Sequence, residues 1–260
     1  MVGDYPYLRI EVAQHAATIA LDRPEAANAL SLEVVRSLHR VLDELASEPR
    51  MLVITSAHPG LFVSGADIAE LAERGTEEAL QGINVELFDR LARWRWPTIA
   101  AIDGPAVGGG LELALACDLR VATPRSWFRQ PELELGILAG AGANHRLVDL
   151  VGLARARRML LLGERMDAEA ALGAGLVDAL AEDALGRAGE LAEELARRPW
   201  RALELTKLAL RHASRPSTRD LDVVAQAVLF ASEQKRERMT AFLSRRRARR
   251  SSDVEAQGES

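Results

Sequence analysis

Residues 106–117 read AVGGGLELALAC, in which three glycines precede an apolar segment that holds a single carboxylate, Glu112. Glycine has no side chain, so such a run lets the backbone turn tightly and approach another group closely. The leucines and alanines that follow are typical of a buried helix. Isolating a carboxylate among apolar residues is costly and raises its pKa toward the range useful for proton transfer. The stretch therefore predicts a glycine loop, a buried helix and a reactive acid at its start.

A second acid, Glu132, lies twenty residues further on, in the segment FRQPE at 128–132. Two embedded carboxylates suggest that one gives a proton and the other takes it. Simpler interpretations remain open for both. Glu112 could satisfy backbone amides at a helix start, and Glu132 could be a surface residue after proline.

Upstream and downstream of this stretch, short apolar runs alternate with amphipathic segments. The runs at 8–12 and 17–21 predict a hairpin, and those at 51–55, 97–102 and 119–122 predict further strands. Helices are predicted from the N-cap Ser31 through Ala46 and over residues 76–94. The repeated order of strand, glycine-bearing loop and helix predicts an α/β fold whose loops carry the function.

The composition changes toward the C-terminus. From about Asp149 the chain is rich in Ala, Leu, Arg and Glu, and Pro199 marks a boundary. We predict an α/β core over residues 1–198 and a helical region over 199–250, with a break near 214–217. Residues 251–260 are polar and are predicted to form a disordered tail.

Composition limits the possible functions. The chain has 260 residues, 48% hydrophobic content and a net charge of −5, which is ordinary for a globular protein and argues against nucleic-acid binding. Five arginines within 245–250 form either a solvated helix end or an anion site. The only cysteine, Cys117, is expected in the core.

No apolar run reaches the ~18 residues that span a membrane, and no secretory signal opens the chain, so we expect a cytoplasmic protein with no membrane partner.

Two loops offer free backbone N–H groups. Gly65 allows a tight turn after which the amides of Ala66 and Asp67 are expected to be unpaired, and residues 108–110 open a second helix. Unpaired amides at two helix starts predict a site for a developing negative oxygen. The alternative is that the glycines only allow close packing of strand and helix.

Several segments carry a resemblance to a known family. They are LDRPEAANAL at 21–30, FVSGADI at 62–68, PTIAAIDGPAVGGGLELA at 97–114, Cys117-Asp118, QPE at 130–132 with Leu135-Gly136, and AGLVD at 174–178. In this order and spacing, from about residue 7 to 247, the chain closely resembles the enoyl-CoA hydratase/isomerase (crotonase) superfamily.

The resemblance implies a crotonase-like spiral of repeated ββα units, with a C-terminal helical region used in assembly of a homotrimer or homohexamer. It implies an acyl-CoA thioester whose carbonyl oxygen lies between the amides of Ala66 and Gly109, flanked by Glu112 and Glu132. Hydratases of the family use two such glutamates to add water across the C2–C3 double bond of a 2-enoyl-CoA. CoA is then part of the substrate, and no metal or redox cofactor is expected.

The resemblance also implies residues that bind the substrate and its CoA portion. They are Arg23, Ala26, Ala27, Ser64, Asp67, Ile68 and Gly110, together with Phe242 and Arg245, which match positions that reach a neighbouring subunit's CoA. Phe242 could equally pack in an oligomer interface.

The chain departs from the family pattern at four positions. Arg129 stands where glycine is common, Ala139 where proline is usual, and Asn144 and His145 where threonine and glutamine are typical. These differences leave the acyl-chain preference open, and the Arg129 cation could lower the pKa of Glu132. We interpret His145 as structural.

Other functions compete with hydration. A sister reaction such as isomerisation or dehydration is possible on the same scaffold, as is a non-catalytic acyl-CoA-binding protein. GAGA at 140–143 lacks the third glycine and the preceding strand of a dinucleotide site. Ser64 lacks the G-x-S-x-G spacing of a serine hydrolase.

Overall fold

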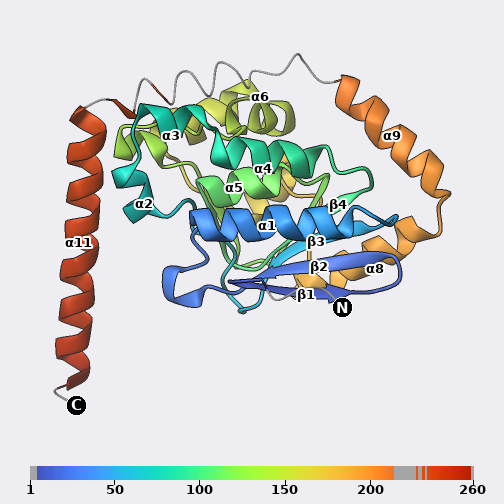
Figure 1. The fold of residues 1–260 in the computed structure, drawn as a ribbon, viewed down its shortest axis with the longest axis horizontal. Helices are drawn as coiled ribbons and strands as arrows, with labels where there is room; N and C mark the ends of the chain where they lie inside the picture. Colours follow the sequence, from blue (N-terminus) through green and yellow to red (C-terminus); the bar gives the residue numbers. More distant parts are fainter. Residues whose placement is uncertain (1–4, 214–226, 228–229, 232, 259–260) are drawn as a thin grey trace.

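A six-stranded sheet organises the fold. The computed structural model describes residues 5–213, 227, 230–231 and 233–258 (Figure 1). The sheet has the order β1 (Leu8–Val12), β2 (Ala16–Leu21), β3 (Met51–Ser56), β4 (Thr98–Ile102), β6 (Leu119–Ala122) and β9 (Ala179–Leu180). The β1–β2 pair is the predicted antiparallel hairpin, and the other neighbours are parallel. The predicted α/β fold and its buried strands are therefore confirmed.

A smaller sheet joins β5 (Pro105–Val107), β7 (Trp127–Arg129) and β8 (Met166–Asp167). Strands β5 and β7 pair in parallel, with Val107 opposite Arg129. Because β5 leads into the glycine run and β7 leads toward Glu132, this pairing brings the two predicted acids to the same part of the molecule.

Helices make up most of the remaining structure. They are α1 (Leu32–Leu45), α2 (Ile68–Glu73), α3 (Thr76–Leu80), α4 (Ile83–Ala92), α5 (Gly109–Leu115), α6 (Ala143–Leu162), α7 (Ala168–Ala174), α8 (Ala184–Ala196), α9 (Trp200–Ala213) and α11 (Glu233–Gly258), with 3-10 turns η1 (Pro24–Ala26) and η2 (Glu132–Leu135). Ser31 caps α1 as predicted, since its side chain accepts from the Val34 amide. Helix α8 packs against β3, β4 and β6.

The predicted helix over 76–94 is two helices instead. Gly82, between α3 and α4, has φ +60, a left-handed conformation that interrupts the helical path. The residues that follow the break line the cavity described below.

The C-terminal helices lie at opposite ends of the molecule (Figure 1). Helix α9 begins directly after Pro199, at the predicted boundary, while the predicted break at 214–217 lies outside the described residues. Helix α11 continues to Gly258, so the structure has helix where we predicted a disordered tail. Glu, Ala and Gln at 255–257 favour helix, and adding residues to an existing helix is easier than starting one.

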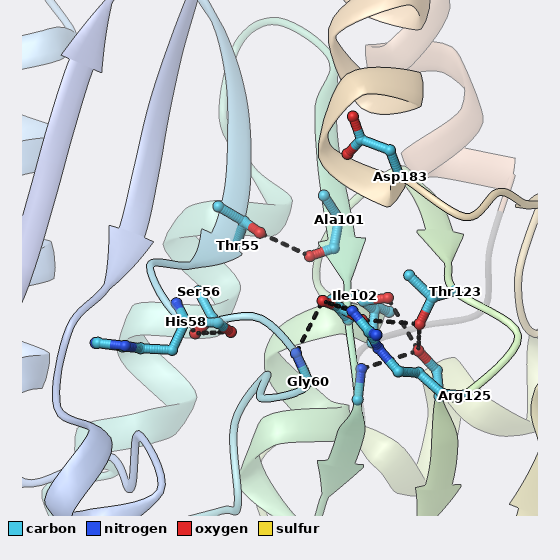
Figure 2. A network of polar contacts seen from close by, with 12 residues as sticks. Thr55, Ser56, His58, Gly60, Ala101, Ile102, Thr123, Arg125 and Asp183 are labelled. Atoms are coloured by element: carbon cyan, nitrogen blue, oxygen red, sulfur yellow. Dashed lines mark hydrogen bonds and ion pairs between the residues drawn. The ribbon is translucent and has the colours of Figure 1, made fainter.

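A polar network ties together the loops at the carboxyl ends of β3, β4 and β6 (Figure 2). The Asp103 carboxylate accepts hydrogen bonds from the Gly60 amide (2.9 Å), the Thr123 hydroxyl (3.0 Å) and the Arg125 guanidinium. These contacts hold the pKa of Asp103 below its ordinary value despite partial burial, which opposes the shift. The network joins the two loops that continue into the candidate site.

Candidate active site

Two loops run side by side toward the site. Val63 pairs in parallel with Ala106. A Cβ on Gly104 would lie 2.3 Å from the Gly60 carbonyl oxygen, and a Cβ on Gly110 would lie 2.0 Å from the Val63 carbonyl oxygen. Only glycine allows the two backbones to approach so closely at these positions. The glycines therefore set the spacing of the two loops.

The pairing brings together the two amides that the resemblance singled out. A Cβ on Gly109 would lie 3.4 Å from the Ala66 nitrogen, and a Cβ on Gly65 would lie 3.7 Å from the Gly109 nitrogen. Gly109 is the first residue of α5, where N–H groups have no acceptor within the helix. The Asp67 amide, also predicted to be unpaired, instead donates to the Leu30 carbonyl at 3.2 Å. Two neighbouring donors thus remain, on Ala66 and Gly109.

Glu112 is anchored by a loop on its far side. The residue is 3% exposed, and its Oε1 accepts hydrogen bonds from the amides of Ala141 (2.7 Å) and Ala143 (3.2 Å). Hydrogen bonds from N–H groups favour the charged form of a carboxylate and fix its orientation. Glu112 is therefore a held, buried carboxylate with a surface on the cavity.

Glu132 has a different environment. It begins η2, and a Cβ on Gly108 would lie 2.9 Å from its Oε1. Burial, followed by the negative charge of Glu112, raises the pKa of Glu132 to about 8. With its nitrogen turned toward Glu132, the Gln130 amide donates to Oε1 at 2.9 Å. Burial and the neighbouring carboxylate therefore both favour the protonated form of Glu132.

Arg129 does not produce the downward shift that its position suggested. Its guanidinium is directed elsewhere, donating to the Gly163 carbonyl at 2.7 Å and pairing with Glu134. Its charge acts to lower the pKa of Glu132, but this effect is smaller than the upward effects of burial and Glu112.

One cavity collects these groups. Its lining includes Glu112, Glu132, Ala66 and Gly109, along with Ser64 and Ile68. Much of its remaining wall is apolar, formed by Leu71, Leu135, Ile137, Leu138, Val85, Ile83 and Phe230. Predicted residue Gly110 does not line the cavity, since it packs against the Val63 backbone. The site thus combines two acids, two amide donors and an apolar wall.

Comparison with known proteins shows the family to which the whole chain is similar. The family model described as "Enoyl-CoA hydratase/isomerase" matches residues 11–251. The chain belongs to the enoyl-CoA hydratase/isomerase family. It is 33% identical to the short-chain-enoyl-CoA hydratase of Clostridium acetobutylicum over 92% of this chain and 95% of that one. It is 36% identical to the 2,3-dehydroadipyl-CoA hydratase of Escherichia coli, over 90% and 94%.

Solved structures agree with this family assignment. The crystal structure of an enoyl-CoA hydratase/isomerase from Mycobacterium paratuberculosis superimposes with a TM-score of 0.84 at 26% identity, covering 92% of this chain and 100% of that one. A putative enoyl-CoA hydratase from Streptomyces avermitilis gives a TM-score of 0.83 at 29% identity, covering 94% and 92%. The crotonase-like fold expected from the resemblance is therefore confirmed.

Part of the set of residues expected to bind CoA lies on segments that contact the loop carrying Ala66. Arg23 donates to Asp67 at 2.9 Å, and the Ser64 amide donates to the Ala27 carbonyl at 3.1 Å. The turn that contains Ala26 and Ala27 therefore lies against the loop that carries Ala66. None of Arg23, Ala26, Ala27 and Asp67 lines the cavity itself.

The two expected CoA residues of α11 do not line the cavity of their own chain. Phe242 is 36% exposed, and Arg245 donates to the Ala241 carbonyl of its own helix. Helix α11 contacts α2 and η2 through an earlier segment, where the buried Lys235 ammonium donates to the Ala72 and Arg74 carbonyls. The structure therefore leaves their predicted role toward a neighbouring subunit untested.

Sequence reasoning did not assign a role to the residues behind Glu112. Arg146 and Asp89 form a buried ion pair beside the loop that holds Glu112, and Asn144 donates to the Ala139 carbonyl. The sequence signal that could have pointed to this region was the pair of unusual residues Ala139 and Asn144. The structure joins them by that hydrogen bond. Burial lowers the pKa of His145, which does not line the cavity.

Within the described ranges, no group of three or more His, Cys, Asp or Glu residues could hold a metal ion. No helix in that part of the chain is long and apolar enough to cross a membrane.

Proposed function

We propose that this enzyme adds water across the C2–C3 double bond of a 2-enoyl-CoA thioester. The observation that carries the proposal is that two glutamates share one cavity with two backbone amide donors, and that one of the glutamates accepts from two loop amides while the other has a raised pKa. Membership of the enoyl-CoA hydratase/isomerase family supports the acyl-CoA substrate and the hydratase type of reaction.

The electrostatics favour distinct roles for the two acids. Two amides hold Glu112 as a carboxylate, so it suits the activation of water. Glu132, with a pKa of about 8, suits delivery of a proton. This division matches the general rule that neighbouring acids with separated pKa values act as base and acid. The two interact strongly, so the pair titrates together.

The proposed reaction conserves atoms and charge. Glu112 accepts a proton from water while the water oxygen bonds to C3. The π electrons of the double bond move toward C2 and the thioester oxygen, and C2 then takes a proton from Glu132. The proton held by Glu112 returns to Glu132 before the next turnover, so the net change is one water added.

The amides of Ala66 and Gly109 would stabilise the negative charge that develops on the thioester oxygen. Fixed donors in a site that excludes water act strongly on such charge, and losing one typically costs about 10²–10³ in rate. No cofactor enters this scheme, since CoA belongs to the substrate. Assembly as a homotrimer or homohexamer, with Phe242 and Arg245 reaching a neighbour's CoA, is part of the proposal.

The apolar wall suits an acyl chain. A crotonyl-CoA hydratase of Syntrophomonas wolfei, 33% identical to this chain, motivates crotonyl-CoA as the first substrate to test.

Loss of the absorbance of the conjugated thioester would measure hydration. Isomerisation is measured separately, as gain of that absorbance from a 3-enoyl-CoA. Turnover of the 3-enoyl substrate alone, with no hydration of short or longer 2-enoyl-CoAs, would replace hydratase by isomerase. Binding without turnover of either would make the chain an acyl-CoA-binding protein.

A further inference from the structure

The orientation of Glu112 depends on the loop at residues 139–143. The amides of Ala141 and Ala143 both point at one oxygen of the carboxylate. This loop contains no helix or strand until α6 begins at Ala143, so regular backbone bonding does not determine its shape. Side-chain hydrogen bonds to the loop therefore contribute to its shape.

Arg146 supplies one of these contacts. Its Nη1 donates to the Ala141 carbonyl at 3.1 Å, and its Nη2 donates to Asp89 Oδ1 at 2.7 Å. Both side chains are mostly buried, with 14% and 12% of their surfaces exposed. Asp89 belongs to α4, so the guanidinium joins the loop to a helix whose first turn lines the cavity. The two arms of one planar group thus connect two walls of the site.

The sequence of the loop accommodates this guanidinium. Gly142 has φ +121, and a Cβ there would lie 2.1 Å from Arg146 Nη1. Any side chain at 142 would therefore displace the arginine. Arg146 reaches the Ala141 carbonyl only because position 142 is glycine.

Asn144 supplies a second contact. Its Nδ2 donates to the Ala139 carbonyl at 2.8 Å. Position 139 is alanine, whose φ is less restricted than that of proline. The hydrogen bond from Asn144 restrains the same residue by a different means.

We propose that Arg146, held by Asp89, is a positioning residue for Glu112 and acts through the Ala141 backbone, with Asn144 as a weaker second brace. The inference rests on the proposed hydratase function. Ala141 donates its N–H to Glu112 and accepts from Arg146 at its carbonyl, so movement of the guanidinium moves the donor. Misplacing a reactive group by about 1 Å can cost 10²-fold in rate. Substrate binding, which uses other groups, is unaffected.

The decisive variant is Arg146→Lys, which keeps the charge beside Asp89 but has one nitrogen in place of the two-armed group. Arg93→Lys is the matched control. Arg93 lies 3.4 Å from the other oxygen of Asp89, is 63% exposed and makes no hydrogen bond to the loop. Each purified variant is compared with wild type for crotonyl-CoA hydration, affinity for the saturated thioester butyryl-CoA, and thermal unfolding.

We expect Arg146→Lys to lower kcat about 10- to 100-fold, with butyryl-CoA affinity within about twofold of wild type. Arg93→Lys should match wild type in all three measurements. Equal kcat in the two variants would overturn the inference. A fall in kcat for Arg146→Lys that is accompanied by comparable losses of butyryl-CoA affinity and of thermal stability would also overturn it. Should Arg146→Lys fail to fold, Asn144→Ala decides: a several-fold lower kcat at unchanged affinity supports the inference, and an unchanged kcat overturns it. A wild-type protein that hydrates no enoyl-CoA would instead overturn the proposed function itself.

Discussion

The negative charge of Glu112 adds to burial in raising the pKa of Glu132 to about 8. The two acids are twenty residues apart in sequence, yet the pairing of β5 with β7 places both at one cavity. Their surroundings are unequal, because two backbone amides donate to Glu112 whereas burial and the charge of Glu112 raise the pKa of Glu132. Much of the expected behaviour of this enzyme follows from that inequality.

Hydration should slow as the pH rises through about 8. Glu132 gives a proton in the proposed reaction, and it loses that proton above its pKa. The measurement is kcat/KM for crotonyl-CoA between pH 6 and 10, the range that brackets this pKa. A rate that stays level or increases through this range would contradict the role of Glu132 as the acid.

Protein stability should carry the same signature. Since the folded-state pKa of Glu132 is above its ordinary value of 4.5, the folded protein binds the extra proton between about pH 4.5 and 8. The free energy of unfolding therefore falls as the pH rises through this window. Glu132→Gln removes the titration. The unfolding free energy of the variant minus that of the wild type should therefore increase from pH 5 to pH 8 in urea unfolding. A difference that is independent of pH would contradict the raised pKa.

Replacing either acid should abolish most of the activity. Glu112→Gln and Glu132→Gln keep the size of the side chain and remove its proton chemistry, so each should lower kcat by at least ~10²-fold. Glu134→Gln is the matched control, because Glu134 lies in the same 3-10 turn but is exposed and pairs with Arg129. Near-normal rates in both acid variants, with folding intact, would exclude the proposed mechanism.

The contact between Gly110 and Val63 should tolerate no side chain. Gly110→Ala would place a Cβ 2.0 Å from a backbone oxygen, which cannot rotate away. We expect a loss of roughly 1–3 kcal/mol in unfolding free energy, as for other overpacked sites. Gly173→Ala in α7 is the control, since a Cβ there meets nothing within 4 Å and alanine favours helix by up to about 1 kcal/mol. Equal stability of the two variants would mean that the loops can separate without cost.

The fold could be predicted from local patterns to a large extent. The alternation at residues 8–12 and 17–21 predicted the hairpin, and the apolar runs predicted β3 and β4 because both strands are buried on both faces. The break between α3 and α4 was missed, since one glycine in an amphipathic pattern does not reveal its φ. The helix beyond residue 250 was missed because polar composition alone was used as the criterion.

The candidate site was predicted in part. Glu112 and Glu132 were named as isolated acids and the pair Ala66 and Gly109 through the family resemblance, and all four line one cavity. Gly110 was assigned to substrate binding, but its lack of a side chain serves the contact with Val63. Arg146 and Asp89 were not found, because an arginine and an aspartate 57 residues apart carry no local signal of pairing.

The sequence by itself determined the strands, the glycine turns, the family and the two candidate acids, because each depends on the residue types within a short segment. Only the tertiary structure decided that the pKa of Glu132 is raised and that the loop at residues 139–143 holds one oxygen of Glu112. Those properties depend on burial, on the charge of a neighbour and on hydrogen-bond donors that the chain brings from 29 and 31 residues away. Electrostatic energy depends on distance in space, which the order of residues does not specify.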